Sequence, residues 1–329
     1  MKSTYVFDFY NLYIPKGLKY LNTEEGVRIV PLKLAEEFEK NRTKILSPYK
    51  NGGWKTAKCY ITTGSEGEAK KIAGWLESLY SFAQSRSVFF SDWYKYKNGK
   101  KCFSSQLKFI EPRENGFPEL IYGTYSGGAV YTRDVSLFMN IALKTLRQSK
   151  NDKLNEVLTT IYAYLVSHSQ IVEELKFLIM WIALEKLANE HYRGNQKNIF
   201  TPDEIKSIKE AIDKTLDKQL KKDERVAYLK QSLSRDYLYE HNTRQKVLSY
   251  LMSLDLGFDN RKLKKMVGSL VEIRGKLVHN LNSVKLQNKP HYLFYLQKIM
   301  ERVIFRLLGM DKGMEKRFWL NQYNRGTEL

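Results

Sequence analysis

The chain has 329 residues, of which 43% are hydrophobic and 28% are charged, and its formal net charge is +19. This length and composition exclude a disordered chain and predict a folded protein of more than one domain. The charge favours a polyanionic partner, most commonly nucleic acid, although solvated lysine faces are an alternative explanation. The two cysteines, Cys59 and Cys102, stand in neither disulfide-framework nor zinc-site spacing, so neither is expected, and a reducing, cytoplasmic setting fits. The sequence shows no convincing cluster of metal ligands, and we expect no cofactor.

The sequence gives no indication of a membrane location. No uncharged apolar run approaches the roughly 18 residues that a bilayer-spanning helix needs, and the N-terminus lacks the apolar core of a signal peptide. We therefore expect a cytoplasmic protein without a membrane partner.

Residues 1–150 are expected to form a mixed, strand-rich domain. Strands are predicted at Thr4–Leu12, Trp54–Thr62, Val88–Lys97, Cys102–Glu111, Leu120–Tyr125 and Ala129–Thr132. Between the third and fourth of these, Asn98-Gly99 predicts a two-residue hairpin turn of type I′. One helix is expected to begin at a capping box of Ser65 and Glu68 and to end near Ala83. A second is expected over Asp134–Arg147.

Residues 151–329 are expected to be entirely helical, which places the whole chain in the α+β class. The first two helices are expected to bury the stripes Leu154, Leu158, Ile161 and Leu165, and Ile171, Leu175, Leu178 and Ile182. Thr201-Pro202-Asp203-Glu204 has the residue order of a helix start. Later helices are expected over about Asp223–Leu233, Thr243–Leu254, Arg261–Leu281 and His291–Leu308.

A charged residue interrupts the apolar stripe of the helix Arg261–Leu281. At about 100° per residue, one stripe contains Leu263, Val267, Leu270, Leu277 and Leu281, and Arg274 falls in its middle. Arginine is rarely fully buried unless it is paired. Glu185 is a second charge within an apolar face, on an earlier helix. We hypothesise that Glu185 pairs with Arg274 inside the bundle.

His279 lies five residues after Arg274, about 140° away around an ideal helix. It shares the opposite, polar face with Glu272 and Lys276. Arg274 and His279 can therefore flank one cleft only if Gly275 bends the helix or if a second copy of the chain completes the site across a two-fold axis. The alternative for His279 is a surface histidine without a role.

An all-α bundle whose late helix carries Arg274-Gly275-Lys276-Leu277-Val278-His279-Asn280, an Arg-x4-His pattern, resembles the HEPN family. An earlier helix with an embedded glutamate, Phe177–Leu187, is similar to helices of those domains. The resemblance covers residues 151 to about 310. Members of the family include metal-independent endoribonucleases of toxin and antiphage defence systems. The family often has a polar residue directly after the arginine, where this chain has Gly275.

The resemblance implies a homodimeric endoribonuclease that needs no metal. In it His279 would transfer protons, Arg274 would clamp the scissile phosphate, Asn280 would orient the scissile group and Lys276 would add charge. The strand-rich half looks like the sensor or recognition domain for a trigger or regulatory partner that is often fused to such bundles.

Basic residues lead the same helix into the motif. A path for RNA along it would be formed by Arg261, Lys262, Lys264 and Lys265, and the alternative for these residues is a solvated helix face. Two other functions stay open. The first is a HEPN-like module that binds RNA, a nucleotide or a partner protein without cutting, in which Arg274 is purely structural. The second is a scaffold whose charge reflects only its proteome.

Overall fold

The structure is a computed structural model. It describes residues 2–12, 14, 20–23, 26–32, 55–84, 88–97, 100–105, 124–126, 129–131, 133–168, 170, 172–195, 201–219, 224–233, 242–279 and 285–311. The chain divides into two compact units, residues 1–180 with 285–329, and residues 181–284. Unit 1 is therefore discontinuous in sequence, and unit 2 is continuous.

Unit 1 contains a six-stranded antiparallel sheet in the order β2-β3-β4-β1-β5-β6. The strands are β1 (Ser3–Tyr10), β2 (Leu21–Thr23), β3 (Val27–Pro31), β4 (Lys55–Thr63), β5 (Phe89–Lys97) and β6 (Lys100–Ser105). The first strand of the chain is central, and its Phe7 lies opposite Cys59 of β4 and Trp93 of β5. A separate hairpin joins β7 (Thr124–Ser126) to β8 (Ala129–Tyr131).

The expected hairpin between the third and fourth predicted strands is confirmed, because Lys97 pairs with Lys100. The type of its turn, at Asn98-Gly99, lies outside the described residues. The short strands β2 and β3 were not predicted. Neither has the length or the sustained alternation that distinguishes a strand in sequence.

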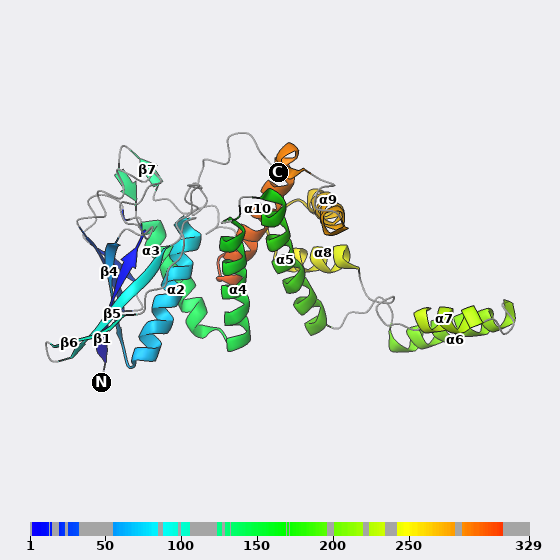
Figure 1. Cartoon of the computed structure of the whole chain (residues 1–329), viewed down its shortest axis with the longest axis horizontal. Helices are drawn as coiled ribbons and strands as arrows, with labels where there is room; N and C mark the ends of the chain where they lie inside the picture. The colour runs from blue at the N-terminus through cyan, green and yellow to red at the C-terminus, as the bar shows by residue number, and fades with distance from the viewer. Residues whose placement is uncertain are drawn as a thin grey trace. The chain divides into compact units, whose positions relative to one another are not determined.

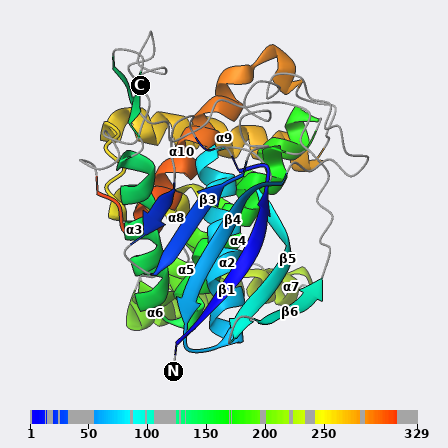
Figure 2. The ribbon, with the colours of Figure 1, turned by 90° about the vertical axis from the view of Figure 1, so that its left-hand side faces the viewer.

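The helix α2 (Glu66–Gln84) covers one face of the sheet, which stands in front of it in Figure 2. Its Lys70 ammonium lies 4.4 Å from the ring centroid of Trp93. The expected N-cap is present, since the Glu68 backbone N–H donates to Ser65 Oγ at 3.2 Å. The Glu68 carboxylate accepts a hydrogen bond from the Thr63 hydroxyl, so the cap also joins the helix to the end of β4.

The core of unit 1 crosses the boundary that the sequence suggests near residue 150. The helices α3 (Arg133–Gln148), α4 (Asn151–His168) and α10 (Pro290–Leu307) follow α2 in this core. The ring of Phe82 on α2 lies 6.4 Å from Phe138, 5.4 Å from Tyr164 and 5.8 Å from Phe305, one residue from each of these helices. Strand-rich and helical parts therefore share one aromatic core. Figure 1 shows the ribbons of these helices.

The helix α5 (Glu173–Asn195) corrects one expectation. Its residues up to Met180 belong to unit 1 and those from Trp181 to unit 2. Its buried face consists of Phe177, Met180, Trp181, Leu184, Leu187 and Ala188. The predicted stripe is wrong, since Leu175 and Ile182 are exposed. The helix is apolar on more than one face, so the spacing of its apolar residues did not identify which face is buried. The buried face is the one that carries the larger aromatic side chains and a methionine.

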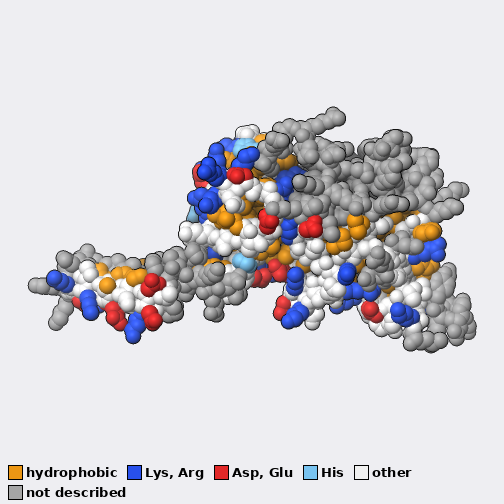
Figure 3. Space-filling model, turned by 180° about the vertical axis from the view of Figure 1, so that it is seen from behind, with side chains coloured by type: hydrophobic (Ala, Val, Ile, Leu, Met, Phe, Trp, Pro, Cys, Tyr) orange, Lys and Arg blue, Asp and Glu red, His pale blue; other side chains and the backbone are white. Residues whose placement is uncertain are grey.

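Unit 2 continues with α6 (Pro202–Gln219), α7 (Glu224–Leu233), α8 (Thr243–Ser253) and α9 (Asn260–His279). The bounds of α7, α8 and α9 agree with the predicted helices to within two residues, and α6 begins where its start was predicted. The Thr201 hydroxyl and backbone N–H both donate to Glu204, as expected for the start of α6. In Figure 3 the α6–α7 hairpin shows hydrophobic side chains bordered by both signs of charge, and Lys230 pairs with Asp217 across it at 2.7 Å.

Among the described residues, no helix has the combination of length and apolar character that crossing a membrane requires.

Candidate functional site on helix α9

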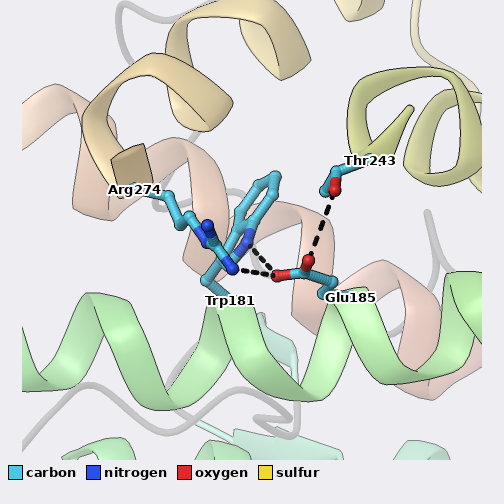
Figure 4. A network of polar contacts seen from close by, with 4 residues as sticks. All are labelled: Trp181, Glu185, Thr243 and Arg274. Carbon is cyan, nitrogen blue, oxygen red and sulfur yellow. Dashed lines mark hydrogen bonds and ion pairs between the residues drawn. The ribbon is translucent and has the colours of Figure 1, made fainter. Parts of the chain in front are cut away.

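One carboxylate in unit 2 receives donors from three helices (Figure 4). Glu185 Oε2 accepts hydrogen bonds from Trp181 Nε1 at 2.9 Å, one turn earlier on α5, and from Arg274 Nη2 of α9 at 3.3 Å. Glu185 Oε1 accepts from Thr243 Oγ1 at 3.4 Å. The hypothesised pairing of Glu185 with Arg274 is confirmed.

The position of Thr243 adds to the neutralisation of Glu185. Thr243 is the first residue of α8, directly after the N-cap Asn242, whose side chain accepts from the Gln245 backbone N–H. A helix N-terminus carries partial positive charge and favours a nearby carboxylate. Glu185 is thus held by a guanidinium, an indole N–H, a hydroxyl and a helix end.

Arg274 is oriented by this network but is not enclosed by it. The buried residues of α9 are Leu263, Met266, Val267, Leu270, Ile273 and Leu277. Arg274 falls between Leu263 and Val267 around the helix, yet it is not buried. Its side chain is 37% exposed, and that of Glu185 is 20% exposed. A guanidinium has five N–H donors. Within the described part of the chain only Glu185 accepts from this guanidinium, and the other donors could contact an anion such as a phosphate.

His279, the last residue of α9, is exposed. Of the described residues, none forms a hydrogen bond, an ion pair or a ring contact with its imidazole. The helix is continuous from Asn260 to His279 and is therefore not broken at Gly275. A single copy of the chain consequently does not bring Arg274 and His279 to one cleft through a bend.

The remaining predicted residues are distributed as follows. Lys276 pairs with Glu272 at 2.6 Å within its own helix, so its charge is partly neutralised there. Asn280 lies outside the described residues. The four cations Arg261, Lys262, Lys264 and Lys265 are all exposed on the first two turns of α9.

Those four cations are unfavourable for the helix itself. Positive charge near a helix N-terminus opposes the macrodipole. Asp259 offsets part of this by accepting hydrogen bonds from the backbone N–H groups of Arg261 and Lys262, both at 2.9 Å. Helix stability therefore does not explain the basic run.

Sequence reasoning missed two contacts of the site. Trp181 lies four residues before Glu185 and so on the same helix face, a spacing that could have indicated the contact. Nothing in the sequence places Thr243 beside Glu185, because that contact depends on how α8 packs. Two exposed apolar residues also adjoin the ion pair: Ile182, 64% exposed and three residues before Glu185, and Val278, 55% exposed and four residues after Arg274.

No group of three or more histidine, cysteine, aspartate or glutamate side chains in the described part of the chain has the arrangement of a metal site. Comparison of the chain with protein-family models, curated proteins and solved structures finds no match.

Proposed function

We propose that this chain is a metal-independent endoribonuclease whose site is built from Arg274 and His279 of α9, as the resemblance to the HEPN family suggests. The observation that carries the proposal is that Arg274 is both held in place and accessible to solvent. Its guanidinium is oriented by Glu185, yet the side chain is 37% exposed. A preoriented cation with free donors is suited to a phosphate that gains charge in the transition state.

All groups that the reaction requires are supplied by the protein and by the RNA itself. The 2′-hydroxyl of RNA attacks the adjacent phosphorus, forming a bond to O2′ and breaking the bond to O5′. A neutral histidine accepts the proton of the 2′-hydroxyl, and a protonated one donates a proton to the leaving O5′. Arg274 neutralises charge on the phosphate oxygens. The products are a 2′,3′-cyclic phosphate and a 5′-hydroxyl.

This reaction needs two proton-transfer groups, and one copy supplies one histidine at this site. A homodimer would bring two histidines and two arginines to one cleft. The exposed Ile182 and Val278 support this step, because each lies one turn from a member of the Glu185–Arg274 pair on its own helix. Exposed apolar side chains around a polar centre are typical of an interface.

We extend the proposal to the setting that the resemblance implies: a cytoplasmic toxin or antiphage defence protein, in which the strand-rich half recognises a trigger or regulatory partner. The second candidate function is a non-catalytic module that binds RNA, a nucleotide or a protein. The engagement of Arg274 by Glu185 favours it, since a structural arginine would make the same contact.

The test uses single-stranded RNA incubated with the purified chain in excess EDTA. We expect fragments that end in cyclic phosphate, and none from the same oligonucleotide with 2′-deoxyribose at the scissile position. His279→Ala should lower the rate about 10²- to 10⁴-fold, and Arg274→Ala about 10²- to 10³-fold. His291→Ala, which removes an exposed histidine of α10, is the matched control and should not change the rate.

Mixing the Arg274→Ala and His279→Ala chains tests the dimeric site. A mixed dimer of these two chains holds one histidine and one arginine, so a cleft that needs both histidines should stay inactive, and a mixture that regains activity would show that one histidine and one arginine suffice. Adding the His279→Ala chain to the parent chain should lower the activity with the square of the parent fraction, whereas a site within one copy predicts a proportional loss. RNA binding without cleavage, unchanged by His279→Ala, would replace the enzyme with the binding module.

A further inference from the structure

The hairpin of α6 and α7 has an apolar stripe that the chain itself does not fully bury. Ile205, Ile208, Ile212 and Leu216 share one side of α6, and all four are half-buried. Of the described apolar side chains of the two helices, only Val226 is buried. No other described element packs extensively on either helix. Figure 3 accordingly shows hydrophobic side chains at the surface of the hairpin.

The helix α7 is too short to cover this stripe. α6 has 18 residues and α7 has 10, so at about 1.5 Å per residue α6 is about 12 Å longer. The Lys230–Asp217 pair places α7 beside the second half of α6, and the stripe at Ile205 and Ile208 extends past it. Helices of this length owe their stability mainly to the packing of an amphipathic face. The hairpin therefore needs a further layer.

The hairpin is electrically neutral, although it belongs to a strongly basic chain. Its two helices contain six acidic and six basic residues, whereas the whole chain carries a net charge of +19. A nucleic acid or an anionic membrane would require a basic surface, which the hairpin does not offer. Two copies of the chain repel each other through their net charge, and a neutral surface is where this repulsion opposes contact least.

The stripe of α6 is complementary to itself under a two-fold axis, because its spacing is nearly the same when it is read from either end. An antiparallel second copy of α6 sets Ile205 opposite Leu216 of that copy. It also sets Ile208 opposite Ile212. An isologous contact of two such stripes encloses apolar side chains along the whole helix.

The charges at the two ends of α6 favour the same arrangement. Asp203 and Glu204 lie in its first turn, and Lys218 lies in its last turn. When two copies run antiparallel, each acidic start lies beside the basic end of the other copy, and the two helix macrodipoles oppose each other. A parallel pair would bring like charges together at both ends.

We propose that the α6–α7 hairpin is a dimerisation element, in which the stripe of α6 packs antiparallel against the same stripe of a second copy and completes a four-helix bundle. Side chains that are half-buried between two helices are then enclosed by four. The inference concerns only the association of two copies, so it holds whether or not the chain cleaves RNA.

Sedimentation velocity of the full chain without RNA, over a series of protein concentrations, measures the dissociation constant of the dimer. Ile208→Ser and Ile212→Ser should each raise it about tenfold or more, because each change removes an apolar side chain from both copies. Tyr228→Ser is the matched control. Tyr228 is 69% exposed and lies about 160° from the buried Val226 around α7, so its loss should leave the constant unchanged. Circular dichroism identifies variants that lose helix.

The charges are tested separately from the apolar stripe. Lys218→Glu places like charges beside Glu204 of the other copy and should raise the dissociation constant roughly threefold or more. This effect should fade at high salt. Lys214→Glu makes the same change at another exposed lysine of α6, which faces Ser207 in the antiparallel arrangement, and should have little effect.

Disulfide cross-linking tests the register and does not depend on the serine variants being folded. It uses the Cys102→Ser chain, whose remaining Cys59 is buried. After mixing and mild oxidation, Ile208→Cys chains should link to Ile212→Cys chains in preference to themselves, because only opposed residues are close enough for a disulfide. Lys214→Cys chains, with the thiol on the outer side of α6, are the control and should not link to Ile208→Cys chains.

The inference is overturned if the chain stays monomeric at every concentration, or if the two serine variants dissociate as Tyr228→Ser does. Self-linked Ile208→Cys dimers in place of the mixed disulfide would also overturn it, because a parallel pair predicts them. A dimer that persists in all variants would place the interface outside the hairpin. That result would leave the ribonuclease proposal intact, since its dimer contact lies at Ile182 and Val278.

Discussion

Arg274 Nη2 of α9 lies 3.3 Å from Glu185 Oε2 of α5, and the same oxygen accepts from the Trp181 indole. The carboxylate is thus the centre of the network, and the arginine is one of its donors. Removing the carboxylate takes one shared acceptor from three donors, whereas removing one donor leaves the carboxylate with the others.

Glu185→Ala should therefore destabilise the fold more than Arg274→Ala does. We expect a loss of about 1–3 kcal/mol for Glu185→Ala, because it leaves the Trp181 N–H without this acceptor. Arg274→Ala should lose about 1 kcal/mol or less, since the pair is partly exposed. Urea unfolding of both single variants and the double variant gives the coupling energy. The exposed Glu272–Lys276 pair of the same helix is the control, with an expected coupling of about 0.3–0.5 kcal/mol. An equal loss for both single variants would contradict the central role of Glu185.

Gly275→Ala should stabilise α9 by up to about 1 kcal/mol, since alanine is the better helix former. A Cβ built at Gly275 meets no atom of the described residues within 4 Å, and the helix is unbroken there. The same change at Gly268 places the Cβ 3.0 Å from the Arg244 guanidinium and should give a smaller gain or none. Thermal unfolding measures both. RNA cleavage that survives Gly275→Ala would show that the site does not need a bend at this residue.

Local sequence signals predicted most helices well, because their apolar spacing and caps agree. The start of α6 at Thr201 and Glu204 and the hairpin at Lys97 and Lys100 are examples. The Arg274–Glu185 pair was predicted from two charges within apolar patterns, although the face assigned to Glu185, with Ile182, is not the buried face of α5. The contact of Thr243 with Glu185 was not, because it depends on packing between helices that are far apart in sequence.

The environment of the Lys298–Glu301 pair of α10 could not be predicted from the sequence. Charges three residues apart on a helix are typical of a solvated face. Here, however, the side chains are only 5% and 1% exposed. Glu301 also accepts from the Tyr164 hydroxyl at 2.9 Å and from Gln297 at 3.1 Å. Burial of the pair comes from the aromatic core of unit 1, which local spacing does not reveal.

Lys298→Met should accordingly destabilise the protein by about 3–5 kcal/mol, because it leaves the buried Glu301 carboxylate without its cation. Adding Glu301→Gln to this variant should restore most of the lost stability. The amide needs no counter-charge and can still accept a hydrogen bond from Tyr164. Lys186→Met, which breaks an exposed pair with Glu190, should change stability by less than about 0.5 kcal/mol. Urea unfolding provides all three values. A failure of the second substitution to restore stability would point to lost packing instead of an unpaired charge.

Cys59 should resist alkylation in the folded protein. Burial raises the pKa of its thiol, so the reactive thiolate stays scarce even near pH 9, where an ordinary thiol of pKa about 8.5 is largely ionised. In a Cys102→Ser chain, iodoacetamide labelling followed by mass spectrometry should detect modification only as denaturant unfolds the protein. Labelling of the native chain at the rate of the unfolded chain would contradict this.

The discontinuity of unit 1 has a consequence for synthesis. Its core needs Phe305 of α10 against Phe82 of α2, yet all of residues 181–284 are translated after Met180 and before α10. Domains generally fold as units, from the N-terminus onward, during translation. In this chain the sheet and α2 emerge first but keep an apolar surface open until α10 has left the ribosome. All residues of unit 2 are therefore synthesised before unit 1, whose translation began first, can complete its core.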